Sequence, residues 1–255
     1  MKIVVCVKQV PDIQSERSIA DGRMVRGQDD VLNELDENAL EAAVTLAEDL
    51  GGTVTALTMG PEGAGDALRR ALQMGADDAV HVCDDRLAGA DAVVTARVLG
   101  AAVRRIAGDG PVDLVVTGMA TMDGLTSMVP TALATVLGLP AVTLAAEVEC
   151  DGSTVRITRT IGEATEVYSA PLPALLSVTD QANEPRIPNF RTMMAAKKKP
   201  IATWDLGDLG LDDVTPAVAV VRAAPRPPRP AGTIITDTGD GGRRLAAYLL
   251  ENRLV

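Results

Sequence analysis

The sequence predicts an α/β fold of three layers, in which helices pack on both faces of a parallel sheet. Short β-branched runs alternate with segments whose apolar residues recur at helical spacing, and this alternation is typical of parallel sheets. Hydrophobic residues make up 47% of the chain and aromatic residues only 2%, so the core must be built from Ala, Val, Leu and Ile. At 255 residues the chain is long enough for one large domain of this kind.

The first half of the chain shows the alternation four times. Asn33 and Asp36 suit the N-terminus of the first helix, because their side-chain oxygens can satisfy free backbone donors. Pro61 is placed to begin the second helix, and Asp91 is expected to cap the third. The strands of these units are predicted at residues 3–7, 53–59, 79–83 and 114–117. We expect the connections between them to be right-handed.

Two segments interrupt the pattern with antiparallel pairs. Residues 13–32 are polar and carry an Asp21-Gly22 turn signal, which predicts a hairpin flap beside the sheet. After residue 140, strands predicted at 147–149 and 154–158 flank a second Asp-Gly turn, and residues 166–168 add a third strand. We expect these antiparallel strands at the edge of the main sheet.

The composition divides the chain into two domains. Residues 1–221 are expected to form an α/β domain of a nucleotide-binding type, and residues 222–255 an extended C-terminal arm. The arm begins with four prolines and three arginines between residues 222 and 230, a composition typical of a linker. It ends in an amphipathic segment at 243–252, and a helix of about ten residues is marginal in water unless it docks. It can dock on this chain or on a partner subunit, and the length of the arm favours a partner subunit.

Composition also narrows the function classes. The net charge of −11 argues against nucleic acid as a partner, because phosphate binding requires Lys and Arg, and residues 197–199 are the one basic run. No apolar run reaches the roughly 18 residues that indicate a membrane span. Cys6, Cys83 and Cys150 are scattered and form no CxxC motif, so a disulfide framework is not expected. A cytoplasmic protein fits these features.

The sequence offers little that could carry catalysis. The single histidine, His81, lies on a predicted strand and is expected to be structural. The cysteines lie on or beside strands and are expected to be small buried hydrophobes. There is no metal-ligand spacing, no GxGxxG motif and no Walker A motif. We therefore expect no catalytic residue and no metal site in this chain, which indicates that the chain is not an enzyme by itself.

The loop at residues 117–127 has the features of a nucleotide site. It leaves the carboxyl end of a strand and opens a helix, where open parallel sheets bind ligands and the helix N-terminus offers donors to a phosphate. Gly118 and Gly124 permit close backbone approach. Hydroxyl groups are supplied by Thr121, Thr126 and Ser127. Many strand-to-helix loops contain Gly, Asp and Thr without binding anything, so the residues alone leave both interpretations open.

Residues 183–199 form a second unusual segment. Pro185 and Pro188 disfavour a regular helix or central strand there. The only phenylalanine of the chain, Phe190, follows them, and a run of three lysines closes the segment. On these residues alone, a solvated surface loop is the simpler interpretation.

Five dispersed motifs resemble the β subunits of the electron transfer flavoprotein family. They are Lys8-Gln9-Val10-Pro11-Asp12, Met59-Gly60-Pro61, the Ala-Leu-Gln-Met-Gly-Ala-Asp run at 71–77, the loop and helix at 118–140, and the Asn-Glu-Pro-Arg to Ala-Lys-Lys-Lys segment at 183–199. Together they cover roughly residues 1–200 in the order found in that family.

The resemblance implies a fold similar to the adenine nucleotide α-hydrolase-like group. It also implies a heterodimer with an α subunit that holds most of a redox-active FAD, and an AMP with a structural role in the β subunit. The nucleotide-binding residues that it implies are Cys6, Asn33, Asp36, Met59, Ala120, Asp123, Gly124, Thr126, Ser127, Val129 and Thr131.

The resemblance further implies a carrier that takes electrons from acyl-CoA or related dehydrogenases to a membrane quinone oxidoreductase. The 183–199 loop corresponds to the family's recognition loop, whose apolar tip holds the dehydrogenase, and Phe190 stands where many members carry Leu. The partner-binding residues that it implies are Asn183, Glu184, Pro185, Arg186, Phe190, Lys197, Lys198 and Lys199.

Two departures from the family pattern leave the ligand open. Pro130 stands near a helix start where many members have glycine, and it has no N–H to offer a phosphate. Leu125 replaces the acidic residue of the Asp-Gly-Asp-Thr run that bifurcating members carry. The ligand is therefore AMP, a second FAD or none. Two alternative functions are a free-standing adenine-nucleotide-binding homodimer of the universal-stress type and an enzyme of the nucleotide α-hydrolase type.

Overall fold

The computed structural model describes residues 1–16, 18–20, 23–108, 110–212, 214–224, 226–232, 234 and 236–255. The chain forms two compact units, Met1–Ala223 and Ala224–Val255. They are called the body and the arm below.

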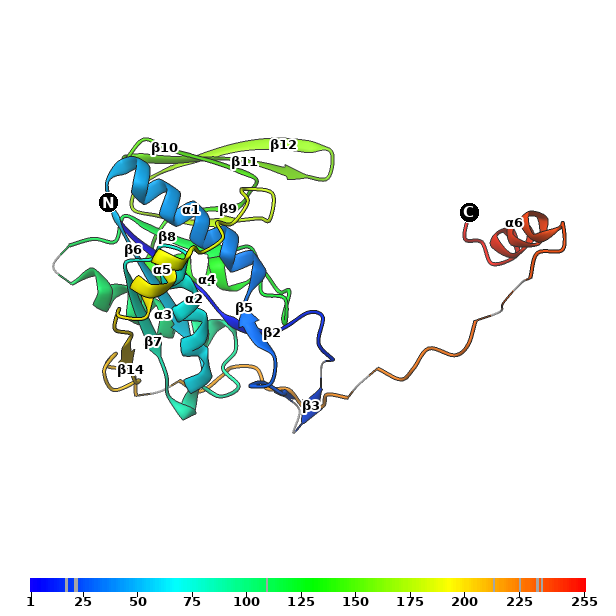
Figure 1. Ribbon diagram of the computed structural model, residues 1–255, viewed down its shortest axis with the longest axis horizontal. Helices are drawn as coiled ribbons and strands as arrows, with labels where there is room; N and C mark the ends of the chain where they lie inside the picture. The colour runs from blue at the N-terminus through cyan, green and yellow to red at the C-terminus, as the bar shows by residue number, and fades with distance from the viewer. Residues whose placement is uncertain are drawn as a thin grey trace. The chain divides into compact units, whose positions relative to one another are not determined.

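The body is built on a seven-stranded parallel sheet (Figure 1). The spatial order is β14-β7-β6-β1-β8-β13-β9, and every neighbouring pair runs parallel. The strands are β1 (Lys2–Cys6), β6 (Thr53–Met59), β7 (Asp78–Val82), β8 (Leu114–Gly118), β9 (Ala141–Ala145), β13 (Ala174–Val178) and β14 (Ala202–Trp204). The predicted three-layer α/β fold is confirmed.

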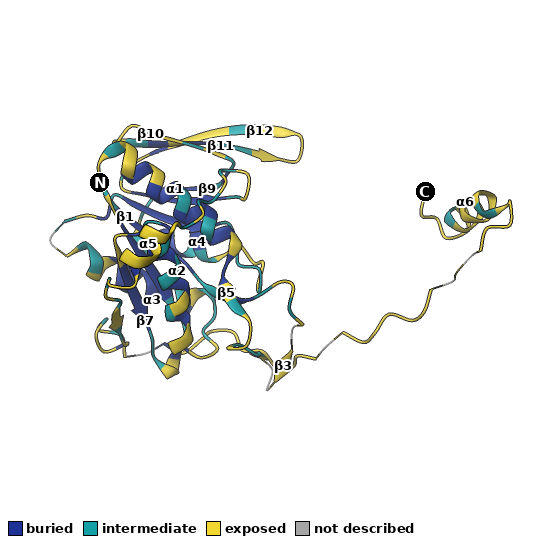
Figure 2. Cartoon of the chain, viewed as in Figure 1, coloured by how far each residue is buried: buried dark blue, intermediate teal, exposed yellow. Residues whose placement is uncertain are grey.

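Helices cover both faces of this sheet. The helices α1 (Glu34–Leu50) and α2 (Gly65–Gln73) share one apolar core with the strands, and α3 (Ala92–Ala107) and α4 (Val129–Leu137) share a second core on the opposite face. Figure 2 shows the buried residues along the central strands and the inner sides of these helices. The short helix α5 (Phe190–Ala196) packs beside α2. Two 3₁₀ turns precede α2 and α3, at η1 (Glu62–Ala64) and η2 (Asp85–Leu87).

The predicted cap of α3 is confirmed, whereas that of α1 is wrong. The Asp91 carboxylate accepts a hydrogen bond of 2.8 Å from the Val94 N–H. Asn33 occupies the N-cap position of α1 but makes no side-chain cap bond. The side chains of Asn33 and Asp36 bond instead to backbone groups of other elements, because both are buried beneath the loop that follows β8.

The flap between β1 and α1 contains the expected hairpin pair and a second antiparallel pair that was not predicted. The strand β2 (Gln9–Pro11) pairs with β5 (Asp30–Leu32), and β3 (Ile19–Ala20) pairs with β4 (Arg23–Met24). The predicted turn residues Asp21 and Gly22 lie outside the described residues.

The later antiparallel strands form a sheet of their own. The strands β10 (Glu147–Cys150), β11 (Thr154–Ile161) and β12 (Ala164–Pro171) pair around the predicted Asp-Gly turn, where Asp151 accepts from the Ser153 and Thr154 N–H groups. They do not extend the main sheet, because β9 already occupies the edge beside β13. The other edge is β14, and neither β9 nor β14 was predicted from the sequence.

The arm carries one helix, α6 (Gly241–Glu251), which begins two residues earlier than the predicted segment. None of its residues is buried, and Leu245, Tyr248 and Leu250 expose about half or more of their surface. Within the described parts of the chain, no helix combines the length and the apolar character that a membrane crossing requires.

Candidate functional site

The strand order places a candidate site at the carboxyl ends of β1 and β8. From β1 the chain builds β6 and β7 on one side of the sheet and then returns to add β8 on the other. This reversal makes the ends of β1 and β8 the switch point of the sheet, and ligands of open α/β sheets bind at such a point. Lys8 leaves β1 there, and the loop at residues 119–128 leaves β8.

The N-terminus of α1 holds the start of the 119–128 loop. The Asn33 side chain donates to the Ala120 carbonyl at 3.0 Å and accepts from the Met122 N–H at 2.9 Å. The Asp36 carboxylate accepts from the Lys8 N–H at 2.8 Å and thereby joins α1 to the end of β1. A β-carbon on Gly118 would lie 2.5 Å from an Asp36 oxygen, so only glycine fits this close approach.

Burial disfavours the charged forms of Cys6 and Asp36. Burial raises the pKa of Asp36 to about 7 against the opposing hydrogen bonds from Asn33 and the Lys8 N–H. Burial and the neighbouring Asp36 raise the pKa of the Cys6 thiol to about 12. The Cys6 thiol is therefore uncharged and has no nucleophilic character at neutral pH.

An unsatisfied hydroxyl lies beside Cys6. Thr117 pairs with Cys6 across β8 and β1, and both lie on the face of the sheet that packs against α3 and α4. Thr117 is buried, and its Oγ1 has no hydrogen-bond partner within the described structure. Buried hydroxyls are normally paired, so this atom is suited to a polar group of a ligand.

Asp123, in the loop that follows β8, forms ion pairs with two cations. The Lys8 Nζ lies 2.8 and 3.0 Å from its two carboxylate oxygens, and the Arg26 guanidinium pairs with the same carboxylate. Burial alone would raise the pKa of Asp123, but Lys8 and Arg26 hold it at about 2. Arg26 also donates to the Gln9 carbonyl at 3.1 Å, so the flap, the end of β1 and the loop are tied together.

The tip of the 119–128 loop is exposed and has a strained backbone. Leu125 and Ser127 have φ values of +49° and +52°, a region that side chains with a Cβ rarely occupy. Gly124, Thr126, Ser127 and Thr131 are exposed, while Val129 and Met59 are partly buried. No side chain caps α4, and Pro130 in its first turn supplies no donor.

The structure thus brings Cys6, Asn33, Asp36, Ala120 and Asp123 together at the carboxyl ends of β1 and β8. Sequence reasoning assigned no site role to Lys8, Arg26 or Thr117. Lys8 stood in a recognised motif, whereas no local signal marks Arg26, which lies 97 positions from its partner Asp123.

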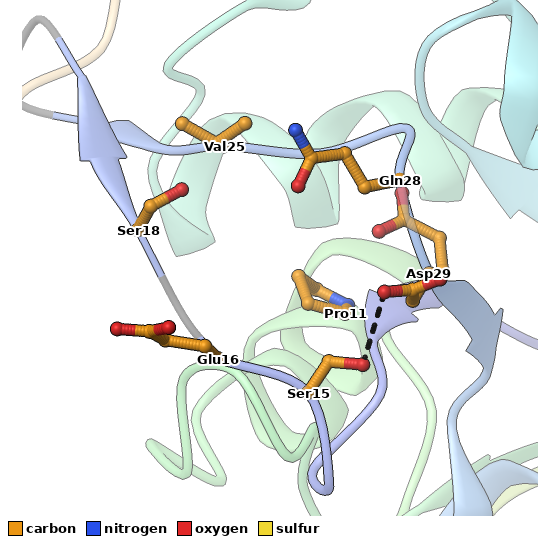
Figure 3. A pocket seen from close by; sticks show the side chains of 8 residues that line it. Pro11, Ser15, Glu16, Ser18, Val25, Gln28 and Asp29 are labelled. Carbon is orange, nitrogen blue, oxygen red and sulfur yellow. Dashed lines mark hydrogen bonds between the residues drawn. The ribbon is translucent and has the colours of Figure 1, made fainter.

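Two surface hollows lie away from these residues. A shallow one of about 20 Å³ lies in the flap, where Ser15 donates to Asp29 at 3.2 Å (Figure 3). A second, of about 180 Å³, lies between the ends of α3 and α4 at the opposite, amino edge of the sheet.

His81 and the cysteines form no assembled centre. The His81 Nε2 lies 3.1 Å from the Gly60 carbonyl, and its ring is buried. The described residues contain no group of three or more His, Cys, Asp and Glu side chains that could hold a metal ion.

The 183–199 loop is exposed at its tip and fastened at its ends. Ile187 and Phe190 expose 89% and 75% of their surface. Asn189 and Thr192 form a capping box that begins α5 directly after the irregular residues. Lys197 and Lys198 are exposed, whereas Lys199 donates to the Ala76 carbonyl at 2.8 Å.

Comparison with known proteins establishes the family to which this chain belongs. The model of the electron transfer flavoprotein domain matches residues 22–209. The chain belongs to the electron transfer flavoprotein family. It is 39% identical to the electron transfer flavoprotein subunit beta of Mycobacterium tuberculosis and 40% identical to that of Mycobacterium leprae, with 99% of each chain covered. It is 32% identical to the beta subunit of Megasphaera elsdenii, over 100% of this chain and 98% of the relative.

Membership of this family makes the chain a subunit of a flavin-associated electron carrier and not an enzyme.

Proposed function

We propose that this chain pairs with an α subunit to carry electrons from acyl-CoA or related dehydrogenases to a membrane quinone oxidoreductase. The observation that carries the proposal is the similarity to β subunits along the whole chain. A flavin, when bound, supplies the redox chemistry, and we propose FAD held mainly by the α subunit. Three unpaired cysteines, Cys6, Cys83 and Cys150, favour the cytoplasm, where thiols remain reduced.

In this proposal AMP binds as a structural ligand at the carboxyl ends of β1 and β8. The unpartnered Thr117 hydroxyl supports a polar ligand there. The N-terminus of α4 has no side-chain cap, which suits a phosphate. The cations Lys8 and Arg26 pair with Asp123 in the loop that precedes this helix. The proposed contacts come from Cys6, Asn33, Asp36, Met59, Ala120, Asp123, Gly124, Thr126, Ser127, Val129 and Thr131.

Two exposed apolar surfaces would serve the two classes of protein partner. The 183–199 loop presents Phe190 to the dehydrogenase, and the exposed Lys197 and Lys198 add positive charge beside it. Within the arm, the apolar residues Leu245, Tyr248 and Leu250 of α6 would dock on the α subunit. Asn183, Arg186 and Lys199 bond within this chain, so we assign them to holding the loop.

The nucleotide content of the purified complex tests this function. The chain is co-expressed with the α subunit encoded by the same organism, and the complex is denatured so that released nucleotides can be separated and quantified. We expect one FAD and one AMP per heterodimer. Two FAD would indicate a bifurcating member. A flavin-free homodimer that contains only AMP or ATP would overturn the carrier function in favour of the stress-protein alternative.

A further inference from the structure

A single guanidinium fastens the 183–199 loop to α1. The Arg186 Nε and Nη2 lie 2.8 and 3.0 Å from the two carboxylate oxygens of Glu41. The Nη1 and Nη2 lie 2.8 and 3.0 Å from the two oxygens of Glu48. The Arg186 N–H adds a bond of 3.0 Å to Glu41. Arginine thus makes two bidentate pairs, a geometry that lysine cannot reproduce.

Neighbouring contacts extend this attachment along α1. Asn38 donates to the Asn183 carbonyl at 2.9 Å, and Asn183 donates to the Asn38 carbonyl at 3.0 Å. Arg186 also lies beside Gly75, whose φ is +122°. Hydrogen bonds from Arg186 hold the pKa of Glu48 below its usual range, so the carboxylate remains ionised.

The other end of the loop is fastened to α2. The Arg69 guanidinium donates to the Lys199 carbonyl at 2.9 Å and also to the Ala196 carbonyl. The Lys199 ammonium donates in turn to the Ala76 carbonyl. Between the two attachments, Ile187 and Phe190 remain exposed. The loop is therefore fixed on both sides of an apolar tip.

The bonds to Glu48 contribute little to the stability of the fold, whereas the Glu41 side chain is only 12% exposed. Glu48 is 60% exposed, and ion pairs exposed to solvent contribute little to stability. The inner face of α1 is already buried through residues such as Leu40 and Ala43. The two bidentate pairs of Arg186 instead fix the position of the residues that follow it.

We propose that Arg186 is a positioning residue that holds the 183–199 loop in its docking conformation before a dehydrogenase arrives. The inference rests on the proposed function. A partner that binds an ordered loop avoids the cost of ordering it. The apparent affinity is proportional to the fraction of molecules whose loop is ordered, so it falls when that fraction falls. Loss of the two bidentate pairs therefore raises the KM of the dehydrogenase for the carrier and leaves kcat unchanged.

The test compares Arg186→Lys and Glu48→Gln with Arg70→Lys in the FAD-containing heterodimer. Arg70 of α2 is a matched control because it pairs at 3.0 Å with Glu37 of α1, the helix that also carries Glu41 and Glu48. Within the described residues, this ion pair does not involve the loop. Amide hydrogen exchange measures the order of residues 187–196. Steady-state reduction by an acyl-CoA dehydrogenase of the same organism, with octanoyl-CoA as donor, gives KM and kcat.

We expect Arg186→Lys to accelerate exchange in the loop and to raise KM about tenfold, the effect of an ordered fraction reduced to about one tenth. Glu48→Gln is expected to act in the same direction with a smaller effect, and Arg70→Lys to change neither quantity. Unchanged loop exchange in both loop variants would overturn the proposal. Faster exchange with an unchanged KM would also overturn it, because the loop's order would then not matter for docking.

The proposed function and this inference fail in different ways. If no nucleotide-loaded heterodimer forms, the carrier function fails. If the heterodimer forms and wild-type electron transfer is intact, the exchange and KM measurements on the variants address the role of Arg186 alone.

Discussion

Phe190 is the single residue on which dehydrogenase docking should depend most. Its side chain is 75% exposed, so its removal should not disturb folding or assembly with the α subunit. Truncation of an aromatic anchor at the centre of an interface costs about 2 kcal/mol or more, which corresponds to about a 30-fold loss. We predict that Phe190→Ala lowers kcat/KM for reduction by the dehydrogenase by about this factor.

The matched control for Phe190 is Val93→Ala. Val93 is also exposed and apolar but lies in α3, on the face of the sheet opposite α1 and α2. It should leave the rate unchanged. A Phe190→Ala heterodimer that accepts electrons at the wild-type rate would remove the anchor role from this residue.

Asp36 should give the unfolding free energy a characteristic pH dependence. Its pKa is raised to about 7 in the folded chain, above the value of about 4 expected when unfolded. The folded state therefore holds the proton more tightly, and this contribution to stability is lost as pH rises from about 4 to 7. A rise of about three units corresponds to roughly 4 kcal/mol at most.

We predict that Asp36→Asn is more favourable relative to wild type at pH 8 than at pH 5, as measured by urea unfolding of the heterodimer. Asp123→Asn supplies the contrast. Its pKa of about 2 means that the carboxylate is ionised at both pH values, so its substitution should destabilise equally at both. Equal effects of Asp36→Asn at the two pH values would contradict the burial of an ionisable Asp36.

At the scale of elements, the sequence predicts what local patterns encode. The strands β1, β6, β7 and β8 and the helix α3 with its Asp91 cap follow from β-branched runs, helical periodicity and a capping residue, all of which act over a few positions. The turn at Asp151-Gly152 is equally local.

Elements without a strong local pattern were missed. The strand β14 has only three residues, and β9 follows Pro140 as a short run that could equally be a loop. Each is a strand because a neighbour offers free backbone groups, β7 for the first and β13 for the second. The position of the antiparallel sheet follows from the same cause, since β9 fills the edge that those strands were expected to occupy.

For the candidate site, the sequence analysis named individual residues but not the contacts between them. The resemblance to known β subunits pointed to Asn33, Asp36 and Asp123, yet Lys8 and Asp123 are 115 positions apart and Arg186 and Glu41 are 145 apart. Such pairs form only once the sheet has brought α1, the flap and the loops together. Asn33 was expected to cap a helix because the preference of asparagine for the N-cap position is a local signal. Its side chain instead bonds to Ala120 and Met122, which are distant in the sequence.

At the scale of the whole molecule, the body and the arm are separate compact units. The body contains both apolar cores, whereas α6 buries none of its residues. A helix of 11 residues is marginal in water, so α6 gains its stability where its apolar residues find a partner. The arm should therefore matter for assembly and not for the folding of the body.

We predict that a chain truncated after Ala223 keeps a folded body but binds the α subunit about 100-fold more weakly, because a tethered second contact multiplies affinity by roughly 10²–10⁴. Circular dichroism reports the fold, and titration of the α subunit reports the dissociation constant. Replacement of Leu245 and Tyr248 by Ser in the full chain should weaken binding in the same direction, since it removes the apolar surface and keeps the arm. An unchanged dissociation constant in both variants would mean that the body alone holds the α subunit, and α6 would then need a different partner.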